Sequence, residues 1–368
     1  MKMYWEMKKI LSRKSVWCGI CFLVIYTIYL FYFDVRYNEN SVTDTGDVIV
    51  GKEAILMNQK VAEKYKGSIT DEKLEELWDE YQNKPVGIKK NGVEVRNTTL
   101  KLFEQLIFWY PRSLQEAYPQ LEIEELEKIQ YGYSDVWQHI FISIKEVMVC
   151  FPFVLILIVA PVISFDKQCG VYPFILTLKY GRRKLIKEKT WACLMLANIV
   201  FFVVMMVLCG SYLLRYGLCG YDTSIQYGLW NAFLRSDCLV TYGYLLLHTL
   251  FFDWMVINTL VLIILLVSKK TSSPFASMGI SFAIMYLGNI EVIYNILSGA
   301  VPTVKRIFSF LPINALNIIQ VASVPTIKWG DIRIYWFYVL EITYVAGFAL
   351  FYVWLMGQED RKNNNKAV

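Results

Sequence analysis

The sequence predicts an all-α polytopic membrane protein with six transmembrane helices, both termini in the cytoplasm and a mainly helical extracellular domain. Three observations predict this fold: the composition, six apolar stretches of membrane-spanning length and a one-sided distribution of basic residues. Of the 368 residues, 56% are hydrophobic and 19% are charged, and the mean hydropathy is +0.38. Soluble domains contain about 45–50% apolar and about 25% charged residues, so the composition indicates contact with lipid.

A bilayer core of about 30 Å requires roughly 20 apolar residues in a helix. The six expected spans are Val16–Phe33, Val147–Phe165, Trp191–Leu213, Leu239–Val267, Ala276–Leu297 and Tyr335–Met356. The second span has an alternative start near His139. A cleavable signal peptide is the alternative interpretation of the first stretch. That stretch is longer than a signal-peptide core, and no small-residue cleavage site follows it.

Basic residues near the span ends predict the orientation, because Lys and Arg accumulate in short cytoplasmic segments. They precede the first span, fill the loop between spans two and three, follow span four and close the chain. With six crossings, all four segments lie on one side, which makes both termini cytoplasmic. The net charge of +5 is too small to indicate a nucleic-acid partner. We therefore expect a multi-pass protein of the cell membrane, in contact with membrane lipid.

Three parts follow from these spans. They are an N-terminal cytoplasmic segment with the first span (1–33), an extracellular domain (34–138) and a five-helix transmembrane domain (139–368) with a cytoplasmic loop at 164–190. In the extracellular domain, Lys52–Lys66 is predicted to be a helix that Gly67 ends. A second helix is predicted to begin at Thr70 as N-cap. Its apolar stripe is Leu74, Leu77, Trp78 and Tyr81.

Two later extracellular segments are long and partly apolar. Ile307–Leu311 and Ala315–Val321 are expected to form short interfacial or re-entrant helices. Cys219 and Cys238 share one of the loops, where they form either a disulfide or two free thiols.

One segment resembles a nucleotide-binding loop but lacks an essential residue. Gly46–Lys52 fits the first seven positions of a phosphate-binding loop, whereas the eighth position, which needs Ser or Thr, is Glu53. A carboxylate there repels phosphate. We therefore expect no cofactor in this chain and no enzyme activity of its own, and any ATP hydrolysis must occur in another subunit.

The most informative segment is the loop between spans two and three. Val171, Phe174, Ile175 and Leu178 fall on one helical face, and a strongly basic stretch then leads into span three. A basic flank that lies on anionic lipid would explain this pattern without a partner. The spacing is more specific: Asp166 lies four residues before Gly170, Arg182 twelve residues after it, and Lys189 seven residues after Arg182.

In this spacing the loop resembles the one after the second span in permease subunits of type-2 ABC exporters. Departures from the family pattern are Gln168, Val171, Lys179 and Glu188, where the family has an acid, Thr, Pro and Gly. The large domain after span one is similar to that of permeases from Gram-positive bacteria. The resemblance implies a coupling helix that docks on a separate ATP-binding subunit, which binds ATP and Mg, and pairing with a second permease copy or a homologue. Phe174, Ile175 and Leu178 would then form the docking face, while Asp166 and Arg182 would hold the shape of the loop.

Ionisable residues inside spans are costly and call for a partner or a wet cavity. The candidates are His248, Asp253, Glu291 and Glu341. They either line a substrate route or make interhelical hydrogen bonds, together with Asn258, Asn289 and Asn295. No metal site is expected, because the chain has only 2 His and no metal-like Cys spacing.

The leading hypothesis is therefore a permease subunit that exports an amphipathic substrate, such as a peptide, an antibiotic or a lipid-like molecule. The alternatives are a membrane enzyme that acts on lipid, which the two separated His residues disfavour, and a sensor or immunity protein whose extracellular domain binds a ligand. A neighbouring gene for an ABC ATPase would favour the first hypothesis.

Overall fold

The computed structural model describes residues 2–43, 47–68, 70, 72–73, 75–76, 79, 87–90, 93–96, 121–172, 174, 181–226, 236–286, 302–329 and 332–364. Five helical segments are long and apolar enough to cross a membrane. They are α2 (Lys14–Asn38), α8 (Asp135–Val159) continued by α9 (Pro161–Gln168), α11 (Gly181–Tyr216), α12 (Tyr242–Lys270) and α18 (Trp336–Asn364). The chain is thus a mainly helical, multi-pass membrane protein.

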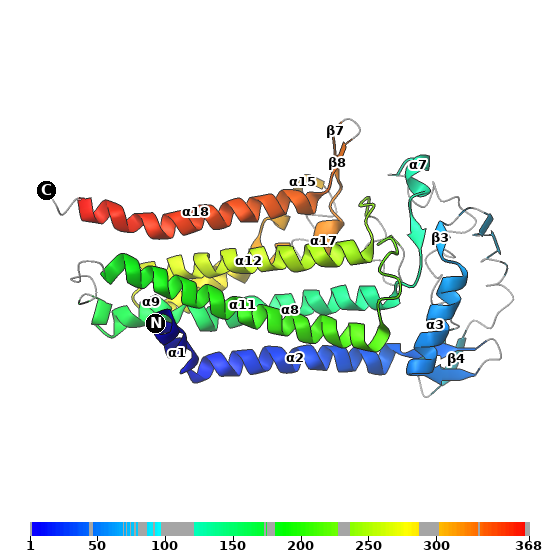
Figure 1. Cartoon of the computed structure of the whole chain (residues 1–368), viewed down its shortest axis with the longest axis horizontal. Helices are drawn as coiled ribbons and strands as arrows, with labels where there is room; N and C mark the ends of the chain where they lie inside the picture. Colours follow the sequence, from blue (N-terminus) through cyan, green and yellow to red (C-terminus); the bar gives the residue numbers. More distant parts are fainter. Residues whose placement is uncertain are drawn as a thin grey trace.

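These helices coincide with five of the six predicted spans, and the second begins early, at Asp135. The fifth predicted span corresponds to α13 (Pro274–Tyr286), an apolar helix of 13 residues. The rest of that prediction, residues 287–297, lies outside the described residues. Both ends of the described chain lie at one end of the bundle, and the segment between α2 and α8 lies at the other end (Figure 1).

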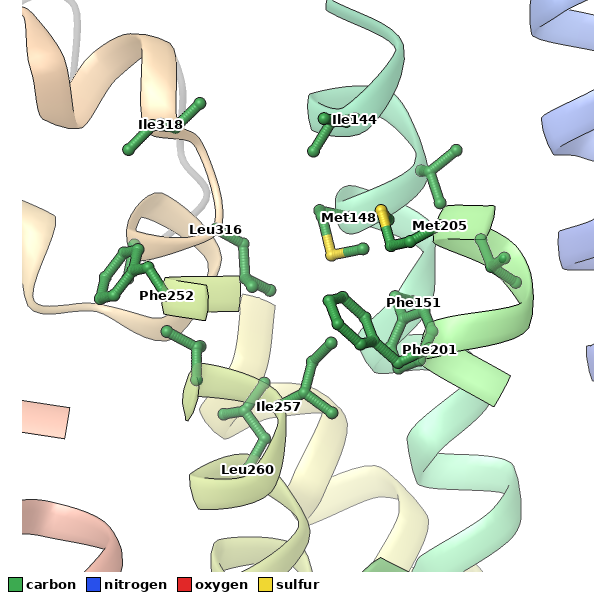
Figure 2. Close-up of a cluster of buried hydrophobic side chains, with 14 of the residues drawn as sticks. Ile144, Met148, Phe151, Phe201, Met205, Phe252, Ile257, Leu260, Leu316 and Ile318 are labelled. Atoms are coloured by element: carbon green, nitrogen blue, oxygen red, sulfur yellow. The ribbon is translucent and has the colours of Figure 1, made fainter. Parts of the chain in front are cut away.

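The centre of the bundle is formed by α8, α11 and α12, which lie between α2 and α18 (Figure 1). Figure 2 shows part of this core, with labelled side chains from all three helices and from the segment before α18. By contrast, α2 and α18 expose apolar side chains along their length, as expected for lipid contact. Examples are Phe22, Ile25, Tyr29, Ile342, Leu350 and Val353.

The helix that starts at Asp135 is interrupted at Pro161, because proline has no N–H and its ring displaces the preceding turn. Ser268 of α12 makes hydrogen bonds with the backbone groups at this interruption. Its hydroxyl accepts the N–H groups of Ile163 (3.2 Å) and Ser164 (3.0 Å), and it donates to the carbonyl of Ala160 (2.6 Å). A side chain from a neighbouring helix therefore satisfies the backbone where lipid could not.

An N-terminal helix, α1 (Lys2–Leu11), precedes the first span and packs against α11 and α2. This helix was not predicted, although Met3, Met7, Ile10 and Leu11 recur at helical spacing. Ile10 is fully buried, while Trp5 on the other face is exposed. The helix is therefore amphipathic, with its apolar face packed against the bundle.

The segment between α2 and α8 contains more strand than the sequence analysis expected. Its described elements are β1 (Asn40–Val42), β2 (Val48–Val50), α3 (Lys52–Lys64), β3 (Gly67–Ser68), β4 (Gly87–Lys90), β5 (Val93–Arg96), α7 (Ile123–Leu126) and β6 (Gln130–Tyr131). The strands pair antiparallel as β1–β2, β3–β6 and β4–β5. The helix predicted at Lys52–Lys66 is present and ends two residues early.

The second predicted helix is only partly described. The N–H of Lys73 donates to the Thr70 hydroxyl at 3.4 Å, as expected of an N-cap. Its apolar stripe of Leu74, Leu77, Trp78 and Tyr81 lies outside the described residues.

Between α13 and α18, three short helices form a layer that we call the cap segment (residues 302–324). They are α15 (Pro302–Ser309), α16 (Pro312–Ala315) and α17 (Ile318–Ala322). The two stretches predicted to be short helices fall here, with the second split between α16 and α17. A hairpin of β7 (Ile327–Trp329) and β8 (Ile332–Ile334) connects the cap segment to α18.

The turn after α11 is fixed by a glycine. Gly220 has a φ of +78°, and a Cβ added to it would lie 1.6 Å from the carbonyl oxygen of Tyr133. Only glycine allows this approach, which holds the loop after α11 against the start of α8.

Candidate functional site

The loop predicted to be the coupling helix lies at the end of the bundle that also carries the two chain ends (Figure 1). α9 ends at Gln168, and Gly170 turns the chain with a φ of +70°. After this turn Val171 and Phe174 are helical and exposed, and the Phe174 residue is 76% exposed. An exposed aromatic side chain thus lies at this end of the bundle.

The remaining positions of the predicted docking face are not described. Ile175 and Leu178 lie outside the described residues, and so does the side chain of Arg182. Their proposed roles stay predictions.

The base of the loop is held by a network of charged side chains. Lys189, only 2% exposed, contacts Asp166 at 2.8 Å and Glu6 at 3.1 Å, and it donates to the carbonyl of Val162 at 3.1 Å. Lys9 contacts the other carboxylate oxygen of Asp166 at 2.6 Å. Alternating charges therefore join α1, α9 and α11, and each buried charge has an opposite partner.

Two more basic residues reinforce this base. The ammonium group of Lys167 donates to the carbonyls of Lys269 and Thr271 at the end of α12, the latter at 3.1 Å. The Arg13 guanidinium lies 5.8 Å from the Phe165 ring centre. Burial lowers the pKa of Arg13, while nearby Cys193, Asp166 and Glu6 oppose that shift. The group stays charged because arginine titrates far above neutral pH.

This geometry separates two groups of predicted coupling residues. Asp166 and Lys189 face the interior and pair with each other, so they position the loop and do not present a surface to a partner. Gly170 provides the turn, and Phe174 provides the exposed apolar contact. Glu6 and Lys9, which complete the network, were not among the predicted residues.

Of the candidate intramembrane groups, two are brought together. Nδ1 of His248 on α12 lies 2.8 Å from a carboxylate oxygen of Glu341 on α18. The rings of Tyr244, Phe337 and Tyr338 surround the imidazole, with centroids 4.4, 5.4 and 5.3 Å away. This polar contact, surrounded by aromatic rings, joins α18 to α12.

Asp253 lies apart from this pair. It is fully buried in α12, and among the described residues neither carboxylate oxygen has a hydrogen-bond partner. On the same helix, the side chain of Asn258 exchanges hydrogen bonds with that of Asn198, which also accepts from Trp254 at 2.7 Å. Asn258 thus makes the interhelical contact expected of a structural residue. Glu291, Asn289 and Asn295 lie outside the described residues.

Asp253→Ala is expected to raise the free energy of unfolding by about 1–3 kcal/mol, because it removes a buried polar group that lacks a partner. Asn258→Ala on the same helix should lower it, because it breaks satisfied hydrogen bonds. Thermal unfolding of both variants in detergent checks the pair. A lower melting temperature for Asp253→Ala would show that the carboxyl has a stabilising partner.

One further cluster of ionisable side chains was not predicted from the sequence. His139 on α8 is nearly buried between Asp34 at 2.8 Å and Asp135 at 3.5 Å, with one carboxylate on each ring nitrogen. The i,i+4 spacing of Asp135 and His139 was a usable signal. Both ring nitrogens therefore face carboxylates of the chain itself, and the cluster joins the end of α2 to the start of α8.

Two other expectations concern the opposite end of the bundle. In the segment that resembles a nucleotide-binding loop, Val48–Val50 is strand β2, paired antiparallel with β1, and α3 begins at Lys52. Cys219 and Cys238 are free thiols. The described residues contain no group of three or more His, Cys, Asp or Glu arranged to hold a metal ion.

The chain was compared with known proteins. No protein-family model matches it, and no curated protein is significantly similar to it in sequence.

Proposed function

We propose that this chain is the membrane-spanning permease subunit of an ATP-driven exporter. The observation that carries the proposal is the loop at 164–190. It presents the exposed side chain of Phe174 on a base held by buried charges. A partner that docks there would move α9 and α11 together, because the pair of Asp166 and Lys189 joins the two helices.

In this proposal both termini and the loop are cytoplasmic, the segment from residue 34 to 138 is extracellular, and a second copy or a homologue completes the pathway in the cell membrane. Basic residues gather at the end of the bundle that carries the chain ends, which supports this orientation. ATP and Mg would be bound by the partner subunit. The substrate would be amphipathic and would enter from the membrane.

A detergent pull-down of the tagged chain from its native membrane, followed by mass spectrometry, tests the proposal. We expect an ABC ATP-binding subunit at comparable abundance. Recovery of the chain without such a subunit, under conditions that keep a known ABC complex intact, would contradict it.

One observation favours a sensor or immunity protein as the second candidate. The bidentate pair of Glu39 and Arg215 (2.8 Å to Nε) ties the segment after α2 to the end of α11, so a ligand bound to the extracellular domain could act on the bundle without transport. Co-purification of a histidine kinase in place of an ATPase would favour this function.

A further inference from the structure

The cap segment fills the end of the bundle opposite the loop at 164–190. The apolar side chains that face the bundle are buried: Ile313, Ala315, Leu316, Ile318 and Val321 are all at most 3% exposed. Leu316 and Ile318 belong to the cluster that contains Phe252 of α12 and Met148 of α8 (Figure 2). The cap segment therefore closes the core at this end.

Polar contacts from residues 236–238 hold the end of the cap segment. The Ser236 hydroxyl donates to the carbonyl of Ala322 at 2.6 Å. The Asp237 carboxylate accepts the N–H of Thr326 at 3.0 Å and its hydroxyl at 2.7 Å. These few contacts fix the position at which the cap segment continues into β7.

The hairpin that follows connects the cap segment to the domain between α2 and α8. Arg333 on β8 is paired with Glu125 of α7, and its guanidinium also reaches the carbonyl of Asp237 at 3.5 Å. The two paired side chains are only 12% and 16% exposed. A second pair, Lys328 with Glu122 at 3.5 Å, is 50% and 74% exposed, so it contributes little.

The short segment from α7 to β6 is itself tied to the domain. β6 pairs with β3, which follows α3 in the domain. On its other side, the segment is bonded to the loop after α11: the Gln130 carbonyl accepts the N–H of Ser224 at 2.8 Å, and the Gln130 N–H donates to the Ser224 hydroxyl at 2.9 Å. A displacement of the domain that is transmitted through β3 and β6 would therefore act on Glu125 and, through Arg333 on β8, on the hairpin that continues from the cap segment. Figure 1 shows α7 beside the β7–β8 hairpin at this end of the bundle.

We propose that the pair of Glu125 and Arg333 is a latch that keeps the cap segment closed, so that the domain between α2 and α8 controls its opening. The position of the cap segment on the exit route of a substrate is an inference that rests on the proposed function. The latch itself depends only on the contacts above.

The test uses the full-length chain in membranes. Leu316→Cys places a thiol at a 2% exposed position, and a membrane-impermeant maleimide reports its exposure. The Glu125 carboxylate accepts the N–H of Glu122 at 2.8 Å. Glu125→Gln removes the negative charge but keeps a side-chain oxygen that can accept this hydrogen bond. Glu125→Gln and Arg333→Gln are each expected to raise the labelling rate of Cys at position 316 by about tenfold.

Lys328→Gln is the matched control, because it removes a charge from the exposed pair on the same hairpin, and it should leave the rate unchanged. Rates within twofold of the parent for both latch variants would overturn the proposal. Hydrogen–deuterium exchange of residues 312–324 provides a readout without an added cysteine and should accelerate in the same two variants. Faster labelling without any co-purifying ATPase would retain the latch and contradict the permease function.

Discussion

Phe174→Glu is expected to abolish co-purification of the ATP-binding subunit while the chain still inserts into the membrane. The residue is 76% exposed, so most of its surface is not packed and insertion of the isolated chain should be retained. In a complex, an aromatic residue in an apolar cleft contributes about 2 kcal/mol or more, and a buried carboxylate in its place adds a desolvation cost. Leu178→Asp is expected to have the same effect, because the sequence places Leu178 on the same helical face as Phe174.

The matched control is Phe275→Glu, which changes the same residue type at an 82% exposed position at the start of α13. It should leave co-purification intact. Normal recovery of the ATPase subunit with Phe174→Glu would contradict this assignment of the docking face.

Lys189→Met is expected to lower the free energy of unfolding by about 3–5 kcal/mol, because it leaves buried carboxylates without their main partner. Asp166, with its side chain 6% exposed, would keep only Lys9, and Glu6 would lose its contact with Lys189. The loop would lose its rigid base, so the affinity for the ATPase subunit should fall as well. Thermal unfolding in detergent measures the first effect and the pull-down measures the second.

Lys184→Met provides the control, because Lys184 is exposed on the same helix and its loss should change stability by less than about 0.5 kcal/mol. The double variant Asp166→Asn/Lys189→Met should be less unstable than the sum of the single variants, because the two residues are in contact. Unfolding of Lys189→Met at the temperature of the parent would contradict the role given to this network.

Much of the transmembrane architecture follows from apolar length alone. The stretches around α2, α8, α11, α12 and α18 were predicted because each contains a long apolar stretch with few charged residues. The strands between α2 and α8 were not predicted, because they are two to four residues long and too short for an alternating pattern. The helix α1 was missed although its apolar spacing was present.

The candidate site was predicted in part. The register of Asp166 and Lys189 placed the two residues in one motif, and the structure pairs them. Their partners Glu6 and Lys9 lie more than 150 residues away along the chain, and no local pattern predicts such contacts. The pairing of His248 with Glu341 depends in the same way on how α12 packs against α18.

Photo-crosslinking from position 174 tests the central claim most directly. A benzophenone amino acid replaces Phe174 in the full chain, and native membranes are irradiated and analysed by mass spectrometry. We expect an adduct with an ABC ATP-binding subunit from position 174 and none from the same probe at Phe275. Adducts with lipid alone at position 174, or the same protein adduct from both positions, would contradict it.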